Sequence, residues 1–418
     1  MTSPGHGTAP AIDADRVLAD LRDLAGLTAG PEGARRVCWT EVWESARALL
    51  RDRLAEIGIT EIETDEAGNL WARLPGRNRE EPALAVGSHL DSVPAGGPLD
   101  GALGVMAGLG LLRAWAGSEP APPRDIVLID FADEEGSRFG RSLFGSSALA
   151  GTLDPEKLTG LTDADGERIT DVLARHGVDL STAPEAAGRI GEIGSYFELH
   201  IEQGPVLESE GVSCSAVSGT AGVERHLFDF DGQASHAGTT PMDQRRDAGL
   251  AAAEAAVAIE RIAIENGGVA TTGRIDFEPG IITAVAGGAQ LSVDLRHPEP
   301  EPLARMHEAA VEAGRSAAGG RDCSFNTSPV WRIEPIPFDP RLVALAEQSV
   351  GAAGGRTKAI ASGALHDAAE MARHVPTVMV FAASVAGISH AKEERSTDEA
   401  LRAAIAAYGN LIGAELLE

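Results

Sequence analysis

Histidine and carboxylate side chains at short spacing could hold metal ions in this chain. In GSHLDSVPAGGPLDG (positions 87–101), His89 and Asp91 are one residue apart, and Asp100 follows a glycine-rich turn. Neutral imidazole and carboxylate are good ligands for first-row metals, and a ligating histidine usually needs a carboxylate to orient it. Asp91 could orient the histidine while Asp100 reaches the metal. The alternative is a capped turn in which both aspartates bind local amides.

A second segment, FADEEGSRFG (131–140), places three acids in succession after an apolar run. Their burial is costly unless a cation compensates the charge. Of Glu134 and Glu135, one could bind a metal while the other accepts a proton from water. A solvated acidic turn, with Arg138 as an ion-pair partner, is the alternative.

Two more histidines follow apolar runs: His200 in FELHIEQGPVLE and His390 in GISHAKEE. A lone histidine is more often structural than a ligand. Here, however, four separate strand ends each offer a histidine or a carboxylate. Because ligands of α/β folds bind at the carboxyl ends of strands, we predict one common metal site.

A different segment, GQASHAGTTPMDQRRDAG (232–249), carries His236 in a loop before a predicted helix. Thr239 and Thr240 precede Pro241 at a possible first helical position, so the segment could be only a helix N-terminus. Arg296 ends the predicted strand in SVDLRH. Its guanidinium could clamp a carboxylate with two hydrogen bonds, or form a surface ion pair.

The elements that must position these residues alternate between helix and strand. Apolar spacing predicts helices over 14–24, 42–57 and 103–115, and buried strands over 83–86 and 126–131. A helix over 340–352, a strand over 375–381 and a helix from 398 follow near the end. This order predicts an α/β fold with a mixed, mostly parallel sheet flanked by helices.

The middle of the chain has a different character. Strands over 224–231 and 290–295 and helices over 246–264 and 302–318 predict a small α+β domain. We therefore expect a metal-binding catalytic domain of residues 1–219 and 332–418, with a smaller domain inserted over residues 220–331.

Composition and sequence patterns argue against a nucleic-acid-binding or membrane protein. The 418 residues carry a formal charge of −28, which would repel nucleic acid and anionic membranes. We find no P-loop or dinucleotide fingerprint, no long apolar run and no secretory signal in the first residues. Three distant cysteines suit neither a disulfide framework nor a thiolate metal site. We expect a cytoplasmic protein with no nucleic-acid or membrane partner.

These motifs together resemble the amidase, hydantoinase and carbamoylase branch of the co-catalytic zinc peptidase superfamily. The branch includes N-carbamoyl-L-amino-acid hydrolases, β-ureidopropionases and allantoate amidohydrolases. The resemblance runs from His89 to His390, and EEGSRF, HIEQGPVLE and HAGTTPM are specific to this branch.

The resemblance implies two divalent metal ions per subunit, zinc foremost, with manganese, cobalt or nickel as alternatives. It assigns His89, Asp100 and His200 to one ion, and Asp100, Glu135 and His390 to the other. The same resemblance implies that Glu134 is the general base, that Asp91 is the carboxylate that orients His89, and that His236 stabilises the oxyanion.

The same likeness implies how substrate is held. Gln203, Arg296, Thr283 and His366 are the expected substrate contacts, with Arg296 on a substrate carboxylate. The inserted domain would close over the metals and form a homodimer. Thr283, Leu365 and Lys392 depart from the residues usual in the branch, and these departures concern substrate recognition.

The implied activity is that of a dinuclear metal-dependent amidohydrolase that cleaves a linear C–N bond. The carbamoyl group of an N-carbamoyl-L-amino acid is the leading small-molecule substrate. Allantoate or another ureide, and an unusual amide of secondary metabolism, are alternatives. From a different class, a catalytically silent metal-binding scaffold would have no need to retain Glu134 beside five intact ligands.

Overall fold

The computed structural model describes residues 9–417, and the chain divides into two compact units. Within the described residues, unit 1 comprises residues 9–218, Phe338–Ile360 and residues 365–417. Unit 2 comprises Gly219–Pro337 and Ala361–Ala364. The segment expected as an insertion, residues 220–331, lies within unit 2, which extends further at its carboxyl end.

Unit 1 is built on a mixed sheet with strand order β8-β18-β7-β5-β6-β4-β3. Strands β5, β6, β7 and β18 are parallel, and β3, β4 and β8 run antiparallel to their neighbours. The strands are β3 (Glu61–Thr64), β4 (Leu70–Leu74), β5 (Ala83–His89), β6 (Ile126–Phe131), β7 (Ile193–Ile201), β8 (Cys214–Thr220) and β18 (Thr377–Ala382). The predicted α/β class is confirmed.

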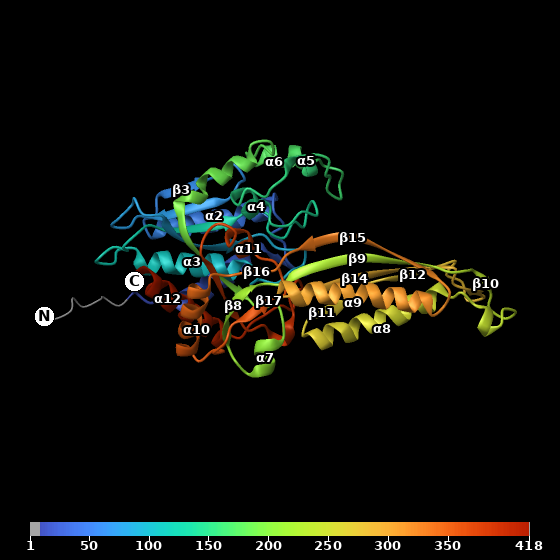
Figure 1. Ribbon diagram of the computed structural model, residues 1–418. Coiled ribbons are helices and arrows are strands. Elements are labelled where there is room, and N and C mark those ends of the chain that lie inside the picture. Colours follow the sequence, from blue (N-terminus) through green and yellow to red (C-terminus); the bar gives the residue numbers. More distant parts are fainter. Residues whose placement is uncertain (1–8, 418) are drawn as a thin grey trace. The chain divides into compact units, whose positions relative to one another are not determined.

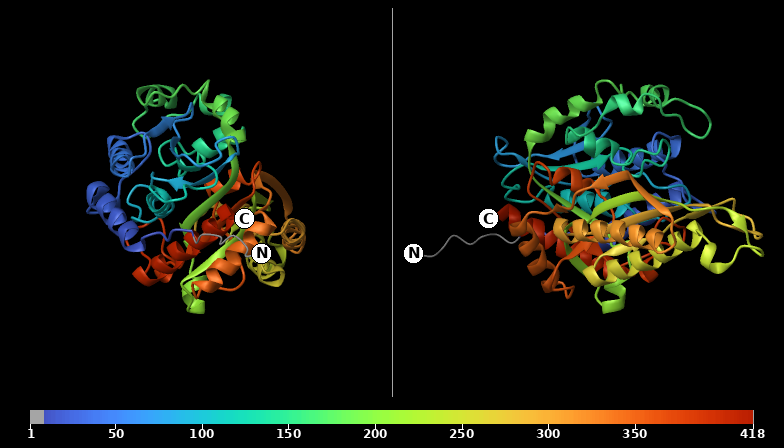
Figure 2. Two further views of the ribbon diagram at one scale, coloured as in Figure 1. Left: turned by 90° about the vertical axis from the view of Figure 1, so that its left-hand side faces the viewer. Right: turned by 45° about the vertical axis from the view of Figure 1, so that its right-hand side comes forward.

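Helices cover both faces of this sheet. One hydrophobic core joins the sheet to five helices: α1 (Ala14–Thr28), α2 (Glu41–Glu56), α3 (Ala102–Trp115), α10 (Pro340–Ala352) and α12 (Asp398–Leu417). Helices α10 and α12 lie side by side (Figure 2). Successive residues of β6 alternate between this core and a second one: Leu128 points to the first, Val127 and Ile129 to the second. Burial on both faces explains why these strands read as continuous apolar runs.

Shorter elements complete unit 1 and the connections between the units. They are β1 (Ala29–Gly30), β2 (Gly33–Ala34), α4 (Phe144–Leu149), α5 (Pro155–Leu158), α6 (Ile169–Arg175), η1 (Ala183–Glu192), α7 (Val206–Glu210), β16 (Ile336–Pro337), β17 (Ile360–Ser362), α11 (Asp367–Met371) and η3 (Val385–Gly387).

Unit 2 is an antiparallel sheet with two helices on one face. Its strand order is β11-β14-β9-β15, and β12 also pairs with β14. These strands are β9 (Gly222–Asp231), β11 (Val269–Thr271), β12 (Ile275–Glu278), β14 (Gly288–His297) and β15 (Ser324–Ile333). Helices α8 (Ala248–Asn266) and α9 (Pro300–Gly319) lie side by side against the sheet (Figure 1). Strict alternation of burial along β14 fits a sheet with one covered face.

Three features of unit 2 were not expected from the sequence. Strands β11, β12 and β15 were not predicted, because their burial is low and their apolar pattern weak. A small pair of strands, β10 (Ser235–His236) and β13 (Ala284–Val285), was also missed. The alternative of a helix N-terminus at Pro241 was wrong: α8 begins at Ala248, two residues after the predicted start at 246, and Asp247 caps it by accepting a hydrogen bond from Leu250 N at 3.1 Å. Residues 242–244 form only a short 3₁₀ turn, η2 (Met242–Gln244).

Among residues 9–417, no helix is long and apolar enough to cross a membrane.

Candidate metal centre and active site

The parallel strands of unit 1 end at one edge of the sheet and bring the predicted ligands there. His89 is the last residue of β5 and pairs in register with Phe131, which ends β6 just before Glu134 and Glu135. His200 lies one residue before the end of β7, and the chain after β18 leads to His390. Parallel pairing thus gathers residues that are up to 301 positions apart in the sequence.

One cluster consists of His89, Asp100 and His200, which are 1%, 3% and 1% exposed. Oδ1 of Asp100 lies 3.2 Å from Nε2 of His200 and 3.7 Å from Nε2 of His89. Gly101 makes this approach possible, because a Cβ at this residue would lie 2.4 Å from the His89 ring. Two imidazole nitrogens and a carboxylate oxygen are suitable donors for a zinc-class ion.

A second cluster consists of Asp100, Glu135 and His390. Nε2 of His390 lies 3.4 Å from Oδ2 of Asp100 and 3.5 Å from Oε2 of Glu135. The other oxygen of Glu135, Oε1, is buried without a hydrogen-bond partner, as expected of an atom that needs a cation. Asp100 is common to both clusters, so the donor set fits two divalent metals that share one carboxylate.

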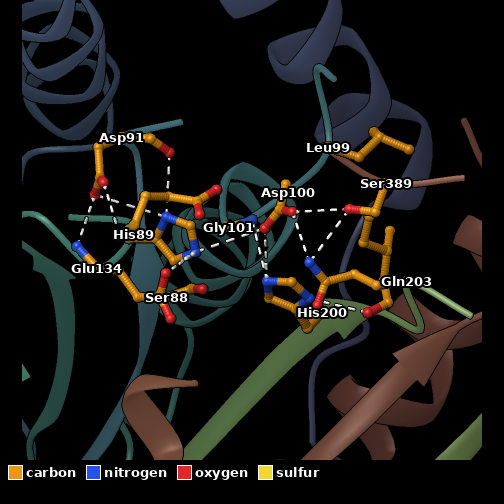
Figure 3. Close-up of polar contacts among 12 residues, drawn as sticks. Ser88, His89, Asp91, Leu99, Asp100, Gly101, Glu134, His200, Gln203 and Ser389 are labelled. Carbon is orange, nitrogen blue, oxygen red and sulfur yellow. Dashed lines mark hydrogen bonds and ion pairs between the residues drawn. The ribbon is translucent and has the colours of Figure 1, made fainter. Parts of the chain in front are cut away.

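Asp91 connects the two strand ends (Figure 3). Its Oδ1 accepts a hydrogen bond from the backbone N–H of Glu134 at 3.2 Å, and its Oδ2 accepts one from Glu135 at 3.1 Å. Nδ1 of His89 is 3.1 Å from the Asp91 carbonyl oxygen and 3.6 Å from Oδ1. The alternative of a locally capped turn is wrong for Asp91, because the amides it binds belong to a different strand end.

Glu134 lies beside the first cluster and is 8% exposed. Its Oε2 is 3.7 Å from Nε2 of His89. Burial, and next the charge of Glu135, raise the pKa of Glu134 well above its ordinary value. A buried carboxyl whose pKa is raised can both take and return a proton near neutral pH.

The histidines of the clusters differ in charge state. Burial lowers the pKa of His89 to about 4. Burial also acts to lower the pKa of His200, but the hydrogen bond and charge of Asp100 outweigh it and raise the value to about 9. A hydrogen bond to Asp100 raises the pKa of His390 to about 9. The shared carboxylate thus holds protons that a metal would displace.

Gln203 and Ser389 both point toward Asp100 (Figure 3). Gln203 Nε2 donates to Oδ2 of Asp100 at 2.8 Å, and the Ser389 hydroxyl donates to the same oxygen at 3.1 Å. Gln203 was expected to contact substrate; its side-chain amide here supports the shared carboxylate. His366, another expected substrate contact, is 2% exposed and packs its ring 4.5 Å from that of His200.

Two buried charged residues near the clusters were missed in the sequence. Glu394 accepts hydrogen bonds from Leu99 N and Asp100 N, both at 3.1 Å, and so fixes the turn that carries Asp100. Its position four residues after His390 could have identified it. Arg36 is fully buried and donates from Nε to the Leu90 carbonyl at 2.7 Å, while its Nη1 and Nη2 have no hydrogen-bond partner. We find no signal in the sequence that marks Arg36.

The Leu90 peptide, between His89 and Asp91, is held from both sides. Arg36 binds its carbonyl, and Asp130 Oδ1 accepts a hydrogen bond from its N–H at 2.8 Å. Asp130 is itself paired with the buried Arg47 at 2.7 Å. Buried charges therefore fix the backbone from which two of the site residues project.

The three site residues predicted in unit 2 fall into two places. His236 on β10 pairs in register with Ala284 on β13, and Ala237 N donates to the Thr283 carbonyl at 2.9 Å, so His236 and Thr283 are neighbours. Arg296 is elsewhere: it lies eight residues beyond Gly288 along β14, about 27 Å at roughly 3.4 Å per residue. Figure 1 shows β10 and β11, the strand paired with Arg296, at opposite ends of unit 2.

Arg296 lines a cavity of about 640 Å³ in unit 2. Its Nε donates to Oδ1 of Asp294 at 2.9 Å and its Nη1 donates to the Gly363 carbonyl at 2.8 Å. Arg225 also binds Asp294, at 2.6 Å. One carboxylate thus faces two guanidinium groups, which leaves net positive charge beside the cavity.

The chain is similar to known proteins over most of its length. The family model described as "Peptidase family M20/M25/M40" matches residues 85–414. An N-carbamoyl-L-amino acid amidohydrolase of Geobacillus stearothermophilus is 35% identical over 93% of this chain and 95% of its own length. An allantoate amidohydrolase of Escherichia coli K12 is 32% identical over 89% of this chain and 91% of its own length.

A solved structure of an amidase of the hydantoinase/carbamoylase family from Burkholderia multivorans superimposes with a TM-score of 0.87. It is 32% identical and covers 97% of this chain and 98% of its own. The chain therefore belongs to peptidase family M20/M25/M40 and, as its motifs indicated, to the hydantoinase and carbamoylase branch.

Proposed function

We propose that this protein is a dinuclear metal-dependent amidohydrolase that cleaves a linear C–N bond, namely the carbamoyl group of an N-carbamoyl-L-amino acid. The observation that carries the proposal is Asp100, shared by two ligand clusters with the buried Glu134 beside them. The similarity to N-carbamoyl-L-amino acid amidohydrolases supports this substrate class.

His89, Asp100 and His200 would hold one ion, and Asp100, Glu135 and His390 the other. Imidazole and carboxylate donors suit zinc, and also accept manganese, cobalt or nickel. When bound, the metals supply Lewis acidity, which lowers the pKa of water and polarises the scissile carbonyl.

Glu134 is the general base in this proposal. It takes a proton from the attacking water and returns it to the leaving nitrogen, which its raised pKa favours. Asp91 positions both partners: it orients His89, and it holds the backbone N–H of Glu134.

Unit 2 would supply substrate recognition and act as a lid and dimerisation domain. We assign His236 to the developing oxyanion, and we assign the substrate carboxylate to Arg296 of one chain together with the Thr283 hydroxyl of the chain that supplies His236. Gln203 and His366 would complete the substrate site in unit 1. The positive charge beside Arg296 supports a carboxylate ligand.

We further propose a homodimer in which each substrate site draws on both chains. His236 and Arg296 lie at opposite ends of unit 2, too far apart for one small substrate to touch both within one chain. Helix α8 also exposes Leu250, Val257 and Ile264 at seven-residue spacing, an apolar stripe suited to a second copy.

The test is ammonia release by chelated and then zinc- or manganese-reconstituted protein over N-carbamoyl-L-amino acids, ureidopropionate and allantoate. Metal-dependent release from an N-carbamoyl-L-amino acid is the expected result. Release from allantoate alone would favour the second candidate, which the similarity to allantoate amidohydrolases supports. Release without metal, or from no compound when two metals are bound, would contradict the proposal.

We also propose a cytoplasmic location without nucleic-acid or membrane partners. The charge of −28 supports it, as do the three cysteines, none of which forms a disulfide.

A further inference from the structure

Three metal-ligating side chains gather in unit 2 that none of the roles above uses. Glu224 and His226 lie on β9 and His307 lies on α9, with one potential ligand atom of each within 4.8 Å of the others. Residues two apart on a strand share a face, and this face of β9 is the one packed against α9. Glu224 is 5% and His226 is 6% exposed, and His307 is partly buried.

The cluster contains buried nitrogens that lack partners. Nε2 of His226 lies 3.0 Å from Oε2 of Glu224, but its Nδ1 is buried with no hydrogen-bond partner. Nε2 of His307 is also buried and unpartnered. Leaving a polar atom buried and unpaired is energetically unfavourable. Two such atoms on adjacent imidazoles favour a ligand that binds to ring nitrogens.

Charge and protonation favour a cation as that ligand. Burial and the neighbouring His226 lower the pKa of His307, which keeps its ring in the neutral form that binds metals. Oε1 of Glu224 pairs with Arg332 at 3.0 Å, and the Arg332 side chain is 61% exposed. This pairing orients the carboxylate and leaves Oε2 directed at His226.

We propose that Glu224, His226 and His307 form an additional binding site for a divalent transition metal of the zinc class. Two imidazoles and one carboxylate, with a fourth position for water, are a common zinc donor set. The imidazole rings are now stacked, with centroids 4.2 Å apart and planes at 24°. To converge on one ion, the partly buried His307 ring must turn out of the stack, which side-chain rotation permits.

The bound ion would join helix α9 to strand β9. Because it binds only the folded arrangement, it would stabilise unit 2 and leave the chemistry of the candidate metal centre unchanged. The site therefore does not depend on the proposed amidohydrolase activity.

The decisive experiment is anomalous diffraction at the zinc edge from crystals of the full chain soaked in zinc. We expect a peak bounded by Glu224, His226 and His307, besides peaks at the candidate metal centre. Peaks at the centre alone, at a zinc concentration that saturates it, would overturn the proposal. This test needs no variant and so is independent of any folding defect.

Variants then assign the ion to its ligands, with metal content measured after dialysis against zinc. His307→Asn is expected to lose the additional metal equivalent, and His200→Asn to lose metal only at the candidate centre. His297 is a buried histidine of the same unit outside the cluster, so His297→Asn is the matched control and should keep the additional metal equivalent. Retention of the additional equivalent by His307→Asn would also overturn the proposal.

Discussion

The side-chain amide of Gln203 donates a 2.8 Å hydrogen bond to the carboxylate of Asp100. The amide therefore orients a group that both ligand clusters need. We expect Gln203→Leu to weaken metal binding by about 10- to 100-fold, the usual effect of losing a residue that orients a ligand. Chelator competition measures this. The neighbouring Glu202→Gln is the control, since Glu202 binds Val206 N and Leu207 N instead. A raised KM with unchanged metal affinity would show that Gln203 serves substrate only.

Replacing the proposed base separates metal binding from turnover. Glu134→Gln keeps the size of the side chain but removes its proton transfer, so we expect kcat to fall by about 10²- to 10⁴-fold. The measurement is kcat on the best substrate of the panel, with metal content determined on the same sample. A variant that keeps both its metals and most of its activity would remove Glu134 from this role.

Arg36 is expected to matter for stability. Arg36→Met leaves the buried Leu90 carbonyl without its donor, which we expect to cost about 1–3 kcal/mol in the free energy of unfolding. Urea unfolding of the metal-free protein measures the change. The adjacent, exposed Arg35→Met is the matched control, expected to change stability by less than about 0.5 kcal/mol. Equal stability of the two variants would show that the hydrogen bond from Arg36 to the Leu90 carbonyl does not stabilise the fold.

The pH dependence of the metal-free protein follows from the shared carboxylate. His200 and His390 have an ordinary pKa of 6.5, and Asp100 raises both to about 9 in the folded chain. The folded chain thus binds more protons than the unfolded chain between these values. The stabilisation is complete below pH 6.5 and is lost as the pH rises through about 9.

Urea midpoints at pH 6.5 and 9, in chelator and in saturating zinc, provide the measurement. We expect a lower midpoint at pH 9 in chelator, and a smaller difference in zinc because the ions displace these protons. A midpoint in chelator that rises with pH would contradict the assignment.

The proposed dimer can be tested by mixing two inactive chains. If one site takes His236 from one chain and Arg296 from the other, dimers that join His236→Ala to Arg296→Ala chains contain one site with both residues intact. When the two variants are mixed and exchange subunits, we expect activity that neither variant has alone. Each variant mixed with itself is the control. Absence of restored activity, with exchange demonstrated, would place both residues in sites formed by one chain.

The sequence predicted the central sheet well for a physical reason. Strands such as β6 are buried on both faces, so their residues form a continuous apolar run with abrupt ends. The motifs that carry the candidate histidine and carboxylate ligands follow those ends, which allowed the edge of the sheet to be predicted as the site. Strand β15 was missed because most of its residues are exposed or partly exposed, so hydrophobicity does not mark it.

What the sequence could not predict depends on contacts between distant segments. Arg36 acts on Leu90, 54 positions away, through one side-chain hydrogen bond, and no local pattern encodes that pairing. The separation of His236 from Arg296 likewise depends on the length and register of β14. Motif likeness assigned both residues to substrate but could not show that they lie at different ends of unit 2.

The two oxygens of Asp100 face different clusters: Oδ1 faces His89 and His200, and Oδ2 faces His390. In the proposed dinuclear centre, occupancy of one cluster would therefore change the charge and orientation of a donor to the other. The two binding equilibria would be coupled, and by reciprocity each ion would alter the affinity for the other by the same factor. The singly loaded protein would then be a distinct species, whose share of the population at limiting metal is set by this coupling as well as by the intrinsic affinity of each cluster.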